Sequence, residues 1–173
     1  PDPTVKRQSG FLMPRFNNSN FLGSSVQVPY YNVIADNRDF TISPRIFFND
    51  KILIQSEYRQ KNKFSNIILD QSFTRNDTKT TNHFFANYNR RYEQNNFEIN
   101  IETTSNNNYL KKYDIDSLLI DSFTTLNSYI SLESSKYDSY FTSSVEVFED
   151  LTKRTSDSYE FVYPNYKFTK NVD

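Results

Sequence analysis

The residue types that carry most enzyme and metal chemistry are scarce in this sequence. There is one histidine, His83, and there is no cysteine, which removes thiolate catalysis, disulfides and Cys-based metal sites. His83 lies in the middle of a strand-like pattern, where a lone histidine is more often a surface or lumen side chain than a general base or a ligand. The G-x-S-x-G, H-E-x-x-H and Walker-loop motifs do not occur. We therefore predict no enzymatic activity, no cofactor and no metal.

Charged residues are numerous but scattered. The 20 basic and 21 acidic residues give a formal net charge of −1, which offers no electrostatic argument for a nucleic-acid partner. Asp36, Asp39 and Asp50 are candidate calcium ligands, but a role in turns, where aspartate is a preferred residue, explains their positions better. The basic pairs at 111–112 and 153–154 are interpreted as solvated loop charge rather than as contacts with an anion.

Apolar and polar residues alternate with a period of two along most of the chain, which predicts β-strands. The segment FEINIE at 97–102 alternates without exception. About ten such segments of roughly 9–11 residues are separated by polar turns. Residues 106–121 depart from this pattern, and YLKKYDIDSLLID at 109–121 favours a long loop with a short helix. The predicted fold is all-β, an antiparallel up-and-down meander of about ten long strands.

The two faces of these predicted strands have different compositions. Only 36% of the residues are hydrophobic, yet 17% are aromatic, and the polar faces are rich in charges and amides. This division is typical of an outer-membrane barrel, in which the apolar face meets lipid and the polar face lines a water-filled lumen. An unrelated porin or transporter barrel, or a soluble all-β binding or adhesion module, stays open as an alternative. In a barrel, the predicted lumen-facing residues are Arg45, Glu57, Arg59, Arg91, Glu98 and Glu102.

Residues 7–31 predict a hairpin with a weakness in each arm. Pro14 and Pro29 stand inside strand-like sequence, and proline has no N–H to donate to a β-ladder. The only two glycines of the chain, Gly10 and Gly23, fall in the same stretch. Taken alone, this pattern indicates an edge hairpin protected against further pairing.

The same stretch resembles a known family. DPTVKRQSGFLMPRF at 2–16 and VQVPYYNVIADNRDFTISPRIF at 26–47 resemble the start of the barrel in the LptD family, also called OstA or Imp, of outer-membrane lipopolysaccharide-assembly proteins. Weaker similarity continues through LIQSEYR at 53–59 and YLKKYDI at 109–115. The resemblance implies that Pro14, Pro29, Gly10 and Gly23 form one side of a lateral gate, through which lipopolysaccharide leaves between the first and last strands of the barrel.

The resemblance also implies an organisation and a set of partners. Residues 1–8 would be the junction with a periplasmic jellyroll that this sequence lacks, and 9–173 would be the first strands of a large barrel, with the longer loop at 106–121. Such a piece is expected to form a curved open sheet or a partial barrel. The implied partners are lipopolysaccharide, an LptE-like plug lipoprotein and, through the jellyroll, an LptA-like periplasmic bridge. The implied location is the cell outer membrane, with the turn at 17–20 and the loop at 106–121 outside and residues 36–39 on the periplasmic side.

Overall fold

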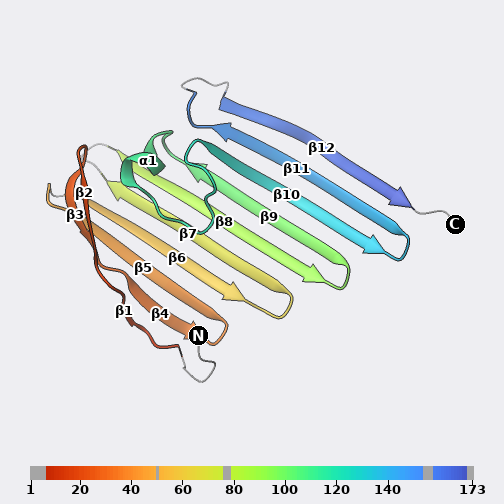
Figure 1. Cartoon of the computed structure of the whole chain (residues 1–173), viewed down its shortest axis with the longest axis horizontal. Coiled ribbons are helices and arrows are strands. Elements are labelled where there is room, and N and C mark those ends of the chain that lie inside the picture. Colours follow the sequence, from red (N-terminus) through yellow and green to blue (C-terminus); the bar gives the residue numbers. More distant parts are fainter. Residues whose placement is uncertain (1–6, 50, 76–78, 154–157, 171–173) are drawn as a thin grey trace.

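The alternating sequence forms an open antiparallel β-sheet (Figure 1). This computed structural model describes residues 7–49, 51–75, 79–153 and 158–170. Among the predicted features, Asp50, residue 154 of the second basic pair and residues 1–6 of the junction lie outside the described residues. The elements are β1 (Gly10–Phe11), β2 (Arg15–Ser19), β3 (Gly23–Gln27), β4 (Tyr30–Ala35), β5 (Arg38–Phe47), β6 (Ile52–Lys61), β7 (Ser65–Arg75), β8 (Thr80–Tyr92), β9 (Asn95–Thr104), α1 (Tyr109–Tyr113), β10 (Thr125–Lys136), β11 (Ser139–Asp150) and β12 (Tyr159–Lys170).

Strands β5 to β12 follow one another in the sheet in the order of the chain. Each pairs antiparallel with its neighbours, and their lengths run from 10 to 13 residues. The prediction of an all-β antiparallel meander that stays open is therefore confirmed. Ten strands lie along the path of the sheet, while β2 and β3 stand off that path as the tip of the first hairpin. The first four strands are short because the arms of this hairpin are interrupted.

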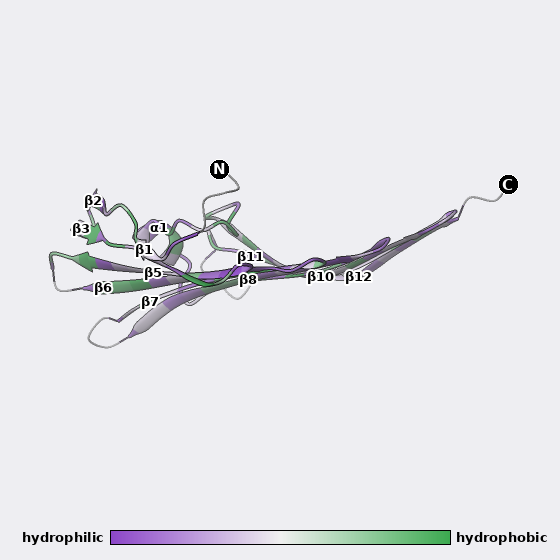
Figure 2. Ribbon diagram, turned by 90° about the horizontal axis from the view of Figure 1, so that it is seen from below, coloured by the Kyte–Doolittle hydropathy of each residue, from purple (hydrophilic) through white to green (hydrophobic). Residues whose placement is uncertain are grey.

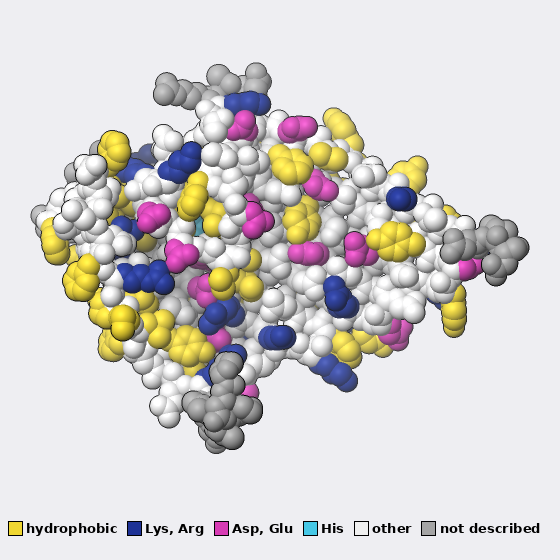
Figure 3. All heavy atoms as spheres, in the orientation of Figure 1, with side chains coloured by type: hydrophobic (Ala, Val, Ile, Leu, Met, Phe, Trp, Pro, Cys, Tyr) yellow, Lys and Arg dark blue, Asp and Glu magenta, His cyan; other side chains and the backbone are white. Residues whose placement is uncertain are grey.

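Strand register divides the side chains between two faces. Glu57 lies opposite Asp70, Asp70 opposite Phe85, and Phe85 opposite Glu102, so all four share one face. We call this the polar face, and Figure 3 shows acidic and basic side chains spread across it. The other, apolar face carries large hydrophobic side chains that remain exposed, among them Ile42, Ile46, Phe73, Phe84, Ile101 and Ile130.

The buried core lies on the polar face, under a segment from the loop between β9 and β10. Figure 2 shows α1 on one side of the sheet, the side toward which β2 and β3 also rise. The helix ends where Asp114 adopts a left-handed conformation with φ of 48°. Burial of a single large side chain of this kind stabilises by about 1.5–3 kcal/mol. The core side chains are Tyr109, Leu110, Tyr113 and Ile115 from the segment, together with Leu22, Phe47, Leu53, Phe85, Leu126 and Leu151.

Among the described residues, no helix is both long enough and apolar enough to cross a membrane.

Candidate functional site

Both arms of the first hairpin stop pairing at a proline. The outer arm is divided into β1 and β2 around Pro14, and the inner arm into β3 and β4 around Pro29. Only two residue pairs join β1 to β4, whereas β2 and β3 pair over five residues each. Because proline lacks an N–H and restricts the residue before it, a continuous ladder cannot form at either place. Pro14 and Pro29, which the sequence predicts to weaken the two arms, therefore lie at the two interruptions of the hairpin.

A third proline lies beside these two. Val28 donates its backbone N–H to the carbonyl of Pro44 in β5 at 3.1 Å, and Leu12 donates to the carbonyl of Pro29 at 2.9 Å. Pro14, Pro29 and Pro44 are separated by the same 15 residues (29 − 14 and 44 − 29), so antiparallel folding brings them to nearly one level of the sheet. Sequence interpretation missed Pro44, although the repeated spacing was a signal that could have identified it.

The two glycines of the hairpin have different roles. Gly23 opens β3 with φ of 73°, a left-handed conformation that favours glycine directly after the turn. Gly10 pairs with Tyr31, and a Cβ atom added there would meet nothing within 4 Å. Only Gly23 therefore has a conformational reason to be glycine.

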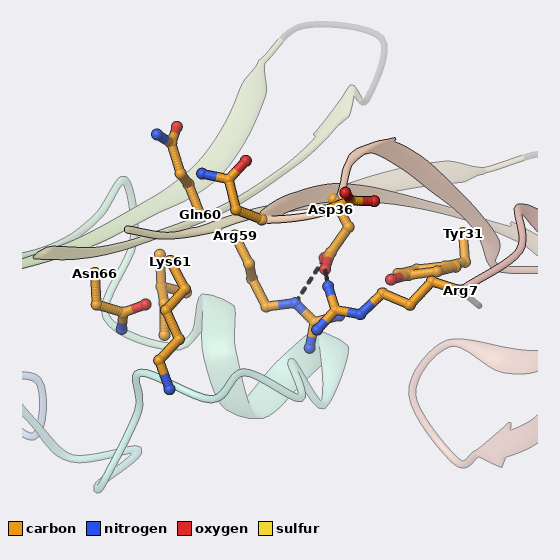
Figure 4. A pocket seen from close by; sticks show the side chains of 10 residues that line it. Arg7, Tyr31, Asp36, Arg59, Gln60, Lys61 and Asn66 are labelled. Carbon is orange, nitrogen blue, oxygen red and sulfur yellow. Dashed lines mark hydrogen bonds and ion pairs between the residues drawn. The ribbon is translucent and has the colours of Figure 1, made fainter. Parts of the chain in front are cut away.

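Side-chain contacts attach the start of the first arm to the sheet, where β1 and β4 share only two residue pairs. Asp39, which is only 4% exposed, accepts from Arg7 Nη1 at 3.0 Å and from Arg59 Nε at 2.8 Å. Ser9 Oγ accepts from the backbone N–H of Val33 at 2.8 Å. Figure 4 shows the guanidinium groups of Arg7 and Arg59 side by side in a cavity of about 540 Å³. The turn role predicted for Asp39 is wrong, because this residue lies within β5 and pairs across the sheet with Arg59.

The six predicted lumen residues share the polar face. Register places Arg45, Glu57 and Arg59 on it in β5 and β6, and Arg91, Glu98 and Glu102 in β8 and β9. The structure brings Glu57 within 3.3 Å of Arg59 but does not gather all six into one cluster.

Hydrogen bonds within and between strands connect polar side chains in the β8–β10 part of the polar face. Glu98 accepts from Tyr129 Oη at 2.8 Å and from Asn87 Nδ2 at 3.0 Å. Glu102 accepts from the backbone N–H of Asn127 at 2.9 Å and from Asn100 Nδ2 at 2.9 Å. The two acidic side chains therefore have amide and hydroxyl partners in place.

His83 is buried and not solvated, which corrects the expectation of a surface or lumen side chain. Its Nδ1 lies 2.7 Å from Ser72 Oγ, its Nε2 lies 3.4 Å from Asp70 Oδ1, and Ser72 Oγ also lies 2.8 Å from Tyr109 Oη of α1. Ser, His and Asp are the residue types of a hydrolase triad. Here all three are at most 1% exposed. With the serine bound to a tyrosine above it, the set fixes α1 to the sheet and offers no access to a substrate.

The described residues contain no group of three or more His, Asp or Glu side chains placed to hold a metal ion.

Sequence comparison finds relatives named LPS-assembly protein LptD. No family model matches the chain. It is 40% identical, over 42% of its length, to the LPS-assembly protein LptD of Ralstonia nicotianae, and covers 9% of that protein. It is 33% identical over 60% of its length to LptD of Cupriavidus necator, and 32% identical over 62% to LptD of Nitrosomonas europaea, covering 13% and 18% of those proteins. These similarities confirm the resemblance seen in the sequence, and the chain spans less than a fifth of the length of each of these relatives.

Proposed function

We propose that this LptD-like chain is the first part of an outer-membrane barrel that inserts lipopolysaccharide into the outer leaflet, and that its first hairpin is one side of a lateral gate. The observation that carries the proposal is the interruption of both hairpin arms at Pro14 and Pro29. The relatives support a role in lipopolysaccharide assembly at the outer membrane, since all three carry that name.

The physical argument concerns the cost of separating the first strand from its neighbours. Each ladder hydrogen bond contributes about 1 kcal/mol net in water, and hydrocarbon around an unpaired backbone raises the cost of breaking it. The pairing of β1 with β4 consists of two residue pairs and one further bond from Leu12 to Pro29. Such an edge separates where an uninterrupted strand of ten residues would stay paired.

The two faces of the sheet fit a lipid boundary and a wet lumen. The exposed aromatic and aliphatic side chains of the apolar face would contact lipid, and the polar face would line the interior through which the sugar part of lipopolysaccharide passes. An LptE-like lipoprotein would occupy that interior, and an LptA-like bridge would deliver the lipid through a jellyroll outside this chain.

The test is to restore strand formers in the full-length protein. Pro14→Val together with Pro29→Val should strengthen the pairing of the first strand with its neighbours. The gate should then open less readily, with less lipopolysaccharide at the cell surface and raised permeability to antibiotics. Pro164→Val in β12, far from the first hairpin, is the matched control and should change neither property. Unchanged surface lipopolysaccharide and unchanged permeability in a correctly assembled double variant would contradict the gate.

A further inference from the structure

The segment at 109–117, which we call the clamp segment, contacts the first hairpin as well as the body of the sheet. Arg15 Nη1 in β2 donates to Asp116 Oδ2 at 2.9 Å, a contact between residues 101 positions apart. Gln55 Nε2 in β6 donates to the carbonyl of Asp116 at 2.8 Å. The clamp segment therefore bridges from the sheet to the strand whose own ladder is interrupted. We propose that it retains the first hairpin, and that the hairpin opens only after this segment leaves the polar face.

Arg45 joins the hairpin and the clamp segment through one buried side chain. It is 5% exposed, its Nε donates to Ser25 Oγ in β3 at 3.0 Å, and its Nη1 donates to the carbonyl of Tyr113 at 2.6 Å. With the amide of Asn17 in β2 oriented to satisfy its neighbours, the side-chain oxygen of Asn17 also accepts from Arg45 Nη2 at 3.3 Å. A buried guanidinium that loses one of these partners is left with unpaired donors, which is costly. The hydrogen bonds of Arg45 to the hairpin and its hydrogen bond to the clamp segment therefore stabilise each other.

Apolar packing between the hairpin and the clamp segment is limited. Leu22 at the hairpin tip is buried in the same core as Tyr113, which is one apolar attachment. A cavity of about 400 Å³ lies between the two, lined by Arg15 and Gln27 of the hairpin and by Tyr113 and Asp116 of the clamp segment. Side chains on opposite sides of this cavity make no direct apolar contact across it, so the attachment depends on Leu22 and on a few polar bonds that can break together.

The ion pair between Arg15 and Asp116 is suited to a reversible contact. Their side chains are 60% and 79% exposed, and exposed pairs are weak and screened by salt. When this pair breaks, Asp116 no longer connects the clamp segment to β2. Departure of the segment then also removes the carbonyl partner of Arg45. The consequence for lipid release rests on the proposed function, whereas the mechanical coupling of the hairpin to the segment does not.

Hydrogen exchange of the β2 and β3 backbone amides tests the coupling in the full-length protein embedded in a lipid bilayer. Asp116→Asn should raise their exchange rates roughly twofold to fivefold. Arg45→Lys keeps the positive charge but removes the planar guanidinium with its several N–H donors, and should raise the rates by about tenfold. Asp121→Asn makes the same chemical change in the same loop, outside the clamp segment, and should have no effect.

A charge exchange makes the test specific. Arg15→Asp and Asp116→Arg should each accelerate exchange in the hairpin, and the double variant should return to the wild-type rate because the pair is exposed and can form in reverse. Equal hairpin exchange in the wild type, Asp116→Asn and Arg45→Lys, or a double variant no slower than the single ones, would overturn the clamp. Surface lipopolysaccharide is measured in the same strains. Faster exchange with unchanged lipid export would support the clamp and count against the gate.

Discussion

At the scale of single residues, Asp39 shows how a buried charge can replace missing backbone pairing. Its two carboxylate oxygens are bound by Arg7, which precedes β1, and by Arg59 of β6. We expect Asp39→Asn to lower the free energy of unfolding by about 1–3 kcal/mol, because both arginines lose a charged partner and the one oxygen of the amide can accept from only one side, while both guanidinium groups stay partly solvated. Denaturant unfolding in detergent measures this change. Asp36→Asn, an exposed residue of the same cavity, is the control, and equal effects of the two substitutions would contradict the structural role of Asp39.

The residue scale also shows what sequence alone could not predict. Alternation assigned Arg59 to a polar position of its segment, whereas Asp39 was assigned to a turn. Their pairing depends on the register of β5 and β6, which no local pattern specifies. His83 was misjudged for a similar reason. The side chain that buries it, Tyr109, comes from a segment 26 positions later in the chain (109 − 83), so its burial is a tertiary effect.

At the scale of elements, α1 is held by a phenol that must stay protonated. Burial raises the pKa of Tyr109 to about 12 from 10.0, against an opposing effect of its hydrogen bond with Ser72. The docked state therefore binds this proton more tightly than the undocked state. Docking is at full strength below pH 10 and weakens as the pH rises from about 10 toward 12.

This pH dependence can be measured with a spin label on the helix. The sequence has no cysteine, so Lys111→Cys provides a single exposed attachment site. Label mobility should increase between about pH 10 and about pH 12, and the increase should be smaller when Tyr109→Phe removes the ionising group. An identical pH response in both proteins would contradict this role of Tyr109.

The elements themselves were the most predictable part of the structure. The long strands follow from alternation, and the breaks at Pro14 and Pro29 follow from proline chemistry. Hydrophobic spacing indicated a short helix, and α1 forms at Tyr109–Tyr113. The docking of that helix onto the polar face was not predictable, because it requires a local patch of Phe47, Leu53 and Phe85 on a face that is otherwise polar.

At the scale of the whole molecule, the open sheet exposes aromatic and aliphatic side chains on one face. Whether lipid or water covers that face determines how much a lysine placed there should lower the stability of the protein. Ile130, in the middle of β10, is 53% exposed on the apolar face, and Ser131 follows it on the polar face opposite Glu98. If the apolar face contacts lipid, Ile130→Lys should cost about 2–4 kcal/mol near the bilayer midplane. Ser131→Lys, beside Glu98 in a wet interior, should change stability by less than about 0.5 kcal/mol.

Unfolding in lipid vesicles by denaturant gives both values, and their difference is what distinguishes the interpretations. A soluble all-β module would have water on the apolar face, so both lysines would be tolerated equally and the membrane proposal would fail. A porin or transporter barrel would give the same large difference as a lipopolysaccharide-assembly barrel, because both have lipid outside. The lysine pair therefore decides the environment of the sheet, and only the proline substitutions at the first hairpin decide what the barrel does there.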